Sequence, residues 1–136
     1  MAKMLVALGL MMMPFTHNEA LAQQNEMMIR ISEIQIHPNY LAEYTAILKE
    51  EAEASVRLEP GVLSIFPIYE KEHPTEIRIL EIYASRDAYE SHLKTPHFER
   101  YKTTTLEMVE SLKLVDMEAI DPETMTRIFG KMRSGK

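Results

Sequence analysis

One short segment of the chain carries two histidines and two tyrosines, namely Tyr89, His92, His97 and Tyr101. Thr95 followed by Pro96 is typical of an N-cap and the first residue of a helix, so we expect one helix to end near Leu93 and another to begin here. The positive end of the second helix disfavours a charged ring at His97, whereas the end of the first helix favours one at His92. The sequence therefore places two imidazoles in contrasting environments on either side of a helix break.

The spacing of His92 and His97 favours proton transfer over metal binding. Metal-binding histidines on one helix normally stand four residues apart, whereas these are five apart across a capped break. An imidazole kept neutral can accept a proton from a phenol or an enol near neutral pH. We therefore predict that either ring could act as a general base and that neither binds a metal. A structural role, in which a ring caps a helix or fills a packing gap, is an equally open alternative.

Glu81 is a third candidate catalytic residue, because it lies between Leu80 and Ile82 in a strand that we expect to be buried. A buried carboxylate needs a partner. That partner could be an arginine or a tyrosine in a purely structural bond, which is the simpler interpretation, or the carboxylate could orient a histidine or take a substrate proton itself. Aromatic rings and one cation are the candidate substrate-binding groups, namely Tyr83, Tyr101, Phe98, Phe66 and Arg78.

The hydrophobic pattern predicts an α+β fold with the order βαββαβ. Strands are predicted over residues 27–36, 62–69, 76–84 and 112–119. Helices are predicted from a cap at Asn39 to a stop at Glu59, from a cap at Ser85 to Leu93, and from a cap at Thr95 to roughly residue 111. Pro67 indicates that the second strand is an edge strand or contains a bulge. This order is typical of a ferredoxin-like, four-stranded antiparallel sheet with helices on one face.

Both faces of the predicted sheet are apolar. In the third strand the set Ile77, Ile79, Tyr83 alternates with the set Leu80, Ile82, Ala84, and in the second strand Val62, Phe66, Ile68 alternate with Leu63, Ile65, Tyr69. Helices in a chain of this length can cover only one face of the sheet. We therefore expect the other face to pack against a second subunit in a homodimer. A sheet with a few exposed apolar side chains is the alternative.

The segment His92-Leu93-Lys94-Thr95-Pro96-His97 resembles the antibiotic biosynthesis monooxygenase family, in its small quinol-monooxygenase-like branch. The resemblance extends upstream through residues 80–83 and 59–61 and covers roughly residues 27–119. It implies a dimeric α/β barrel that oxidises a small quinol or polycyclic phenol with O₂, without metal, flavin or nicotinamide. An isomerase of a small signalling sugar and a non-catalytic small-molecule-binding module are the alternatives. Haem-degrading relatives would place functional residues at His92 and Lys102, and a lysine does not suit as a neutral haem ligand.

The first residues are typical of an export signal. A basic start at residues 1–3 precedes a short apolar run to Phe15, and Ala20-Leu21-Ala22 is a small-x-small cleavage pattern. We predict cleavage after Ala22, a domain over residues 23–120, a polar C-terminal tail over residues 121–136, and a periplasmic or secreted location without a membrane anchor. A frayed amphipathic helix, or a start at Met27 or Met28, is the alternative.

Composition excludes several classes of function. The 136 residues carry a formal net charge of −6, which disfavours nucleic-acid and anionic-membrane surfaces. The chain has no cysteine, so disulfides and thiolate chemistry are excluded. Its four glycines form no phosphate-binding loop, so no nucleotide cofactor is expected. The predicted partners are therefore a small aromatic substrate, O₂ and a second copy of the chain.

Overall fold

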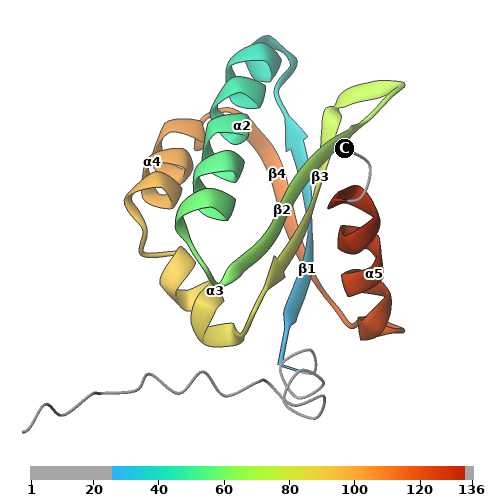
Figure 1. Ribbon diagram of the computed structural model, residues 1–136. Helices are drawn as coiled ribbons and strands as arrows, with labels where there is room; N and C mark the ends of the chain where they lie inside the picture. Colours follow the sequence, from blue (N-terminus) through green and yellow to red (C-terminus); the bar gives the residue numbers. More distant parts are fainter. Residues whose placement is uncertain (1–25, 134–136) are drawn as a thin grey trace, which may run out of the picture.

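The computed structural model describes residues 26–133, so the predicted export signal lies outside the described residues. The elements in order are β1 (Met28–Ile36), a short 3₁₀ turn (Pro38–Tyr40), α2 (Leu41–Leu58), β2 (Val62–Glu70), β3 (His73–Tyr83), α3 (Arg86–His92), α4 (Pro96–Thr105), β4 (Val109–Met117) and α5 (Pro122–Arg133). The four strands form one antiparallel sheet in the order β2-β3-β1-β4 (Figure 1). This confirms the predicted ferredoxin-like α+β fold. No helix within residues 26–133 is long and apolar enough to cross a membrane.

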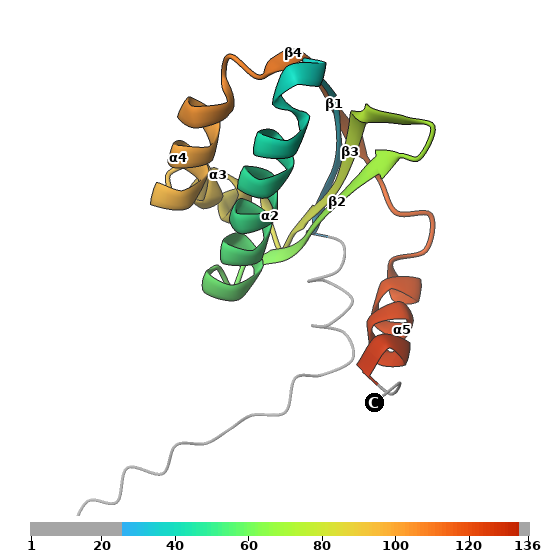
Figure 2. The same ribbon diagram turned by 90° about the horizontal axis from the view of Figure 1, so that it is seen from above.

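The sheet separates the helices into two layers. Helices α2, α3 and α4 cover one face, which we call the inner face, and α5 lies against the other, the outer face (Figures 1 and 2). The prediction of helices on one face therefore holds for the first three helices. The C-terminal residues, expected to form a polar tail, contribute α5 on the opposite side.

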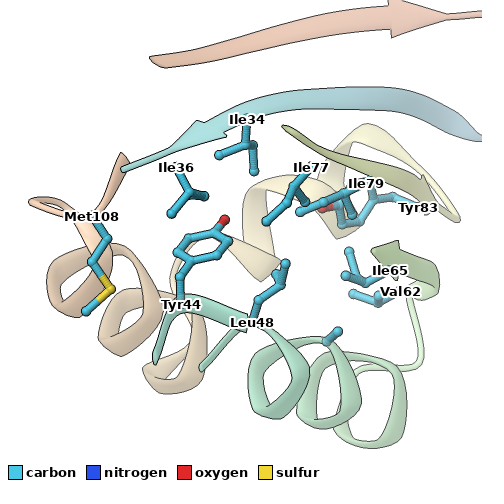
Figure 3. Close-up of a cluster of buried hydrophobic side chains, with 11 residues drawn as sticks. Ile34, Ile36, Tyr44, Leu48, Val62, Ile65, Ile77, Ile79, Tyr83 and Met108 are labelled. Carbon is cyan, nitrogen blue, oxygen red and sulfur yellow. The ribbon is translucent and has the colours of Figure 1, made fainter. Parts of the chain in front are cut away.

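The hydrophobic core lies between the inner face and α2 (Figure 3). It is built from alternate residues of the strands and from side chains that recur on one side of α2, namely Ile34, Ile36, Val62, Ile65, Ile77, Ile79, Tyr83, Tyr44, Leu48 and Ala52, with Met108 closing one end. Tyr44 and Ile36 are completely buried. Apolar residues at helical spacing in α2 and at every second position in the strands thus pack together in one apolar layer.

Two of the three predicted helix caps are confirmed. The Ser85 hydroxyl accepts from the N–H of Ala88, and the Thr95 hydroxyl accepts from the N–H of Phe98. Asn39 instead lies in the 3₁₀ turn, and α2 starts at Leu41 without a side-chain cap.

Helix α4 ends earlier than predicted, and strand β4 begins earlier than predicted. Helix α4 ends at Thr105 rather than near residue 111, and β4 begins at Val109. The buried Met108 explains this difference, because its N–H bonds the Thr105 carbonyl at 2.9 Å and its own carbonyl accepts from the N–H of His37 at 3.0 Å. These bonds stop the helix and bring the chain alongside β1.

A β-bulge in β2 changes which side chains share a face. The register shifts between Val62 and Ser64, so that Val62 and Ile65 both face the inner side. Phe66 pairs with Leu80 and therefore points to the outer face, not to the same side as Val62 as strict alternation predicted. Pro67 lies on an edge strand, as expected from its missing N–H.

The turn between α2 and β2 packs tightly on α3. A Cβ atom on Gly61 would lie 2.6 Å from the Cβ of Ala88, and the Gly61 carbonyl is held at 2.8 Å from the N–H of Ala84. We predict that Gly61→Ala lowers the free energy of unfolding by about 1–3 kcal/mol, because the overlap can be relieved only by moving backbone.

Gly130→Ala in α5 is the matched control, since its added Cβ would meet nothing within 4 Å. Alanine is the better helix former, so stability should be unchanged or slightly higher in this variant. Urea unfolding of both variants checks the prediction, and equal midpoints would contradict it.

Candidate functional site

A single carboxylate oxygen joins the two predicted histidines. Oε2 of Glu59 lies 2.9 Å from Nδ1 of His92 and 2.6 Å from Nε2 of His97. The three side chains are 14%, 3% and 15% exposed, respectively. Glu59 follows α2, His92 is the last residue of α3, and His97 lies in the first turn of α4. We call this arrangement the Glu59–His92–His97 cluster.

The helix break brings the two imidazoles together. The hydroxyl of Thr95 accepts from the N–H of Phe98 and donates to the carbonyl of His92 at 2.8 Å, so the same side chain ends α3 and starts α4. Pro96 occupies the first position of α4, where its missing N–H has no consequence. The centroids of the two imidazole rings lie 6.3 Å apart. The segment singled out from the sequence therefore does form a site, with Glu59 as its unpredicted centre.

The other nitrogen of His92 lies on the side of Glu51. Its Nε2 is 3.6 Å from Oε1 of Glu51, which is beyond a normal hydrogen bond. The hydroxyl of Ser55 lies 2.7 Å from Oε1 of Glu51 and 2.8 Å from the Glu51 carbonyl. Burial raises the pKa of Glu51 above its usual range. The Ser55 hydroxyl is within donating distance of both acceptors, and its bond to the carboxylate offsets part of the effect of burial.

Glu81 is held by two hydroxyl groups. Its carboxylate accepts from the hydroxyl of Ser32 in β1 and, at 2.8 Å, from the phenol of Tyr83. The expected bond to a tyrosine is thus present. Arg30 stands opposite Glu81 in the pairing of β1 with β3, but its side chain bonds Asp116, and Arg78 bonds the Ile77 carbonyl. Burial, followed by the nearby Glu81 charge, raises the pKa of Tyr83 well above its usual range. The phenol therefore stays neutral and donates to Glu81.

A second pair of phenols lies between α2 and α4. The hydroxyl oxygens of Tyr44 and Tyr101 are 2.6 Å apart. Burial raises the pKa of Tyr101 to about 12 and that of Tyr44 further still. Both rings therefore stay neutral and link the two helices at physiological pH.

A cavity of about 550 Å³ lies between the inner face of the sheet and helices α2 to α4. Five of the predicted site residues line it, namely His92, Glu81, Tyr83, Phe98 and Tyr101. Most of the remaining wall is apolar, and the exposed leucines Leu93, Leu106, Leu112 and Leu114 also line the cavity. The polar part also includes Glu51 and the buried Arg30, which is bonded to Asp116 at 2.8 Å, and further polar side chains, namely Ser32, Tyr89, Lys102, Thr105, Glu110 and Ser111.

Three predicted site residues do not line this cavity. His97 contacts Glu59 but is not part of the wall. Arg78 bonds its neighbour's carbonyl and lies 3.6 Å from Glu76, on the outer face of the sheet. Phe66 is 58% exposed on the same outer face. The structure therefore separates Phe66 and Arg78 from the other candidates.

Residues 59, 92 and 97 also contain the donor atoms that a transition metal could use. The nearest nitrogen or oxygen ligand atoms of the three side chains lie within 4.8 Å of one another. Two imidazoles and a carboxylate are common zinc ligands. Coordination would require bare nitrogens on both rings, whereas the short contacts to Glu59 suit N–H groups that donate to a carboxylate. The contacts therefore favour a hydrogen-bonded cluster.

Sequence and fold comparisons agree on one family. The sequence model of the antibiotic biosynthesis monooxygenase family matches residues 27–104, which is more than half of the chain. The fold matches a crystal structure of a candidate antibiotic biosynthesis monooxygenase from Bacteroides thetaiotaomicron with 52% identity and a TM-score of 0.72, covering 73% of this chain and 94% of that one. The chain therefore belongs to the antibiotic biosynthesis monooxygenase family.

More distant structures share the fold. A candidate family member from Caulobacter crescentus has 23% identity and a TM-score of 0.66, covering 78% of this chain and all of that one. A candidate monooxygenase from Lactobacillus acidophilus has 26% identity and a TM-score of 0.67, covering 68% of this chain and 44% of that one. No curated protein gives a significant match.

The burial of Glu51 gives a pH-dependent prediction. Because its pKa is raised in the folded protein, folding becomes less favourable as the pH rises from the ordinary carboxyl value of 4.5 through the raised one. Glu51→Gln is neutral at every pH and removes that penalty. Its melting temperature relative to the native chain should therefore increase steadily above about pH 4.5.

Thermal unfolding of the native chain and the variant across this pH range provides the measurement. Glu53→Gln is the matched control, because Glu53 is exposed on the same helix and pairs with Arg57. A melting-temperature difference for Glu51→Gln that does not change with pH would contradict a raised pKa.

Proposed function

We propose that this family member is a cofactor-independent monooxygenase that oxidises a small quinol or polycyclic phenol with O₂. Membership of the family supports monooxygenase chemistry in general. One observation supports the finer proposal: the buried imidazole of His92, whose Nε2 makes no hydrogen bond within the described part of the chain, lies on the wall of a cavity with a mainly apolar surface. The predicted export signal would place this reaction in the periplasm or outside the cell.

The cavity suits a small aromatic molecule. Its volume of about 550 Å³ lies within the range of small-molecule sites, roughly 300–1,000 Å³. Isoleucine and leucine side chains from the sheet and α2 offer flat apolar contacts, and Phe98 and Tyr101 offer ring faces. The polar groups on the wall could orient such a ligand.

The proposed reaction begins with proton transfer to His92. The substrate O–H bond breaks, an N–H bond forms at Nε2, and the resulting phenolate donates an electron to O₂. One oxygen atom enters the ring and the other leaves as water, so a quinol and O₂ give a hydroxyquinone and water. The substrate supplies all four electrons that reduce O₂ and both hydrogens of the water, one of them by way of His92, so the balance needs no external reductant. The protein contributes deprotonation and confinement.

Neutral phenols and one carboxylate orient the substrate in this proposal. Tyr83 and Tyr101 keep their protons, and Glu81 is fixed by two hydroxyl donors. A polar substrate oxygen near this wall would meet groups whose positions are set before it binds. Phe66 and Arg78 have no part in this arrangement, because they face the other side of the sheet.

We predict that His92→Gln reduces O₂ consumption with a quinol panel by about 10²-fold or more, since the variant keeps the shape but has no base. An oxygen electrode provides the measurement, with dialysed protein under air and under nitrogen. His73→Gln is the matched control, because His73 is exposed at the start of β3. Unchanged oxygen consumption by a folded His92→Gln variant would contradict the role of His92.

The two alternative functions, an isomerase and a binding module, predict different results with their own ligands. Turnover of a sugar phosphate that does not depend on O₂ would identify an isomerase. Tight binding of an aromatic without turnover would identify a binding module. Either result would overturn the proposed oxygenation.

The outer face supports a homodimer, which small proteins of this family typically form. Apolar side chains from all four strands lie on it, namely Phe66, Ile68, Leu80, Ile31, Val115 and Met117. Helix α5 covers only one end, where Met125 and Phe129 approach Leu63 and Ile82. A second sheet packed here would bury the rest.

We predict that Phe66→Asp converts the dimer to a monomer, because the charge would be buried between the paired sheets. Light scattering after gel filtration measures the mass. Val56→Asp is the matched control, since Val56 is 48% exposed on α2, away from the outer face. A monomeric native chain, or a Phe66→Asp variant of unchanged mass, would contradict the dimer.

A further inference from the structure

We propose that Glu59 is a positioning residue that keeps Nε2 of His92 bare as the base in the cavity, and that His97 acts only by holding Glu59. This proposal rests on the proposed function and gives a role to Glu59, which was not among the predicted site residues. It also assigns different roles to two histidines, either of which was predicted as a possible general base.

The tautomer of His92 follows from its partners. A neutral imidazole carries one N–H, and Nδ1 lies 2.9 Å from a carboxylate oxygen that can only accept when ionised. The proton therefore belongs on Nδ1, and Nε2 presents a lone pair. Within residues 26–133, Nε2 makes no hydrogen bond, and Oε1 of Glu51 lies 3.6 Å from it, beyond normal hydrogen-bond distance. A ring that is 3% exposed thus presents this nitrogen to the wall of the cavity.

Glu59 stabilises the product of proton transfer as well as the tautomer. When Nε2 takes a proton from the substrate, Nδ1 keeps its own, and the imidazolium faces the Glu59 carboxylate at 2.9 Å. Both side chains are buried enough that water screens this attraction weakly. The arrangement is the carboxylate–imidazole pairing used by hydrolytic triads, where loss of the carboxylate leaves the wrong tautomer.

His97 is placed to hold Glu59 and not to meet substrate. Its Nε2 is 2.6 Å from the Glu59 oxygen that contacts His92, and its side chain is absent from the cavity wall. Glu59 is thereby tied to α4 as well as to α3. Without the second bond the carboxylate could rotate away from Nδ1, and His92 would lose the group that fixes its tautomer.

Four titratable groups face His92 from the elements packed around it. Glu59 approaches from the turn after α2, Glu51 from α2, His97 from α4 by way of Glu59, and Tyr83 from β3 with ring centroids 5.5 Å apart. Tyr83 stays neutral, and burial favours the neutral form of Glu51. The pH profile of the reaction should therefore change most when Glu59 is altered.

Matched variants separate the two roles. Glu59→Gln should lower kcat by about 10²–10⁴-fold with little change in KM, and should shift the pH profile. His97→Gln, which keeps an N–H donor for Glu59, should retain activity within about tenfold of the native chain, whereas His97→Leu should lose about as much as Glu59→Gln. His73→Gln is the control, and thermal unfolding confirms that each variant folds. A His97→Gln variant as inactive as His92→Gln, or native kcat in Glu59→Gln, would overturn the assignment.

Nitrogen-15 spectra of the histidine rings test the same proposal without turnover. The native chain should show His92 with its proton on Nδ1, and Glu59→Gln should shift that proton wholly or partly to Nε2. A native spectrum with the proton on Nε2, or with both rings bound to a metal, would overturn it. Absence of O₂-dependent turnover with the expected native tautomer would instead defeat the proposed function and leave the positioning role supported.

Discussion

The bond between one oxygen of Glu59 and the two imidazoles is the constraint on which the site depends. It joins three pieces of backbone, namely the turn after α2, the end of α3 and the start of α4. Two buried rings would each cost free energy without a partner, and a single ionised carboxylate satisfies both. The close approach of Gly61 to α3 brings the carboxylate within reach, and the Thr95 cap turns the chain so that both rings face it. The backbone conformation near Gly61 and Thr95 and the hydrogen bonds of Glu59 therefore favour the same arrangement of the two histidines.

Stability and the proposed chemistry use the same residues. Ile34, Leu48, Ile65 and Ile79 belong to the hydrophobic core and also line the cavity. Their burial lowers the local dielectric, which strengthens each hydrogen bond around the cavity and makes an unpaired polar group costly. Most of the buried polar groups are accordingly paired, with Glu81 bonded to two hydroxyls and Tyr44 bonded to Tyr101. Nε2 of His92 is an exception, because it makes no hydrogen bond within the described residues.

The sequence predicts the elements well and the site only in part. The Ser85 and Thr95 caps, the edge position of Pro67 and the shared face of Glu81 and Tyr83 follow from local rules, and the structure bears them out. The bulge beside Val62 reverses the face assigned to Phe66, because one extra residue changes the alternation without a sequence signal. In the sequence, Glu59 marks the end of a predicted helix and falls within residues 59–61 of the family resemblance, but it was not predicted as a site residue. Its partners lie 33 and 38 residues away, a separation that no local pattern reports.

The protonation states and hydrogen-bond partners of the groups around the cavity indicate which of them could act as the base. Burial keeps Tyr83 and Tyr101 protonated, so these phenols donate and do not accept. Arg30 is permanently charged and bonded to Asp116. Glu81 could accept a proton, but its carboxylate already accepts hydrogen bonds from the Ser32 and Tyr83 hydroxyls. Burial raises the pKa of Glu51, yet its Oε1 lies 2.7 Å from the Ser55 hydroxyl rather than open to the cavity. His92 combines an unpaired lone pair with a carboxylate behind it that stabilises the charge it acquires, and proton transfer into the cavity wall therefore favours this ring.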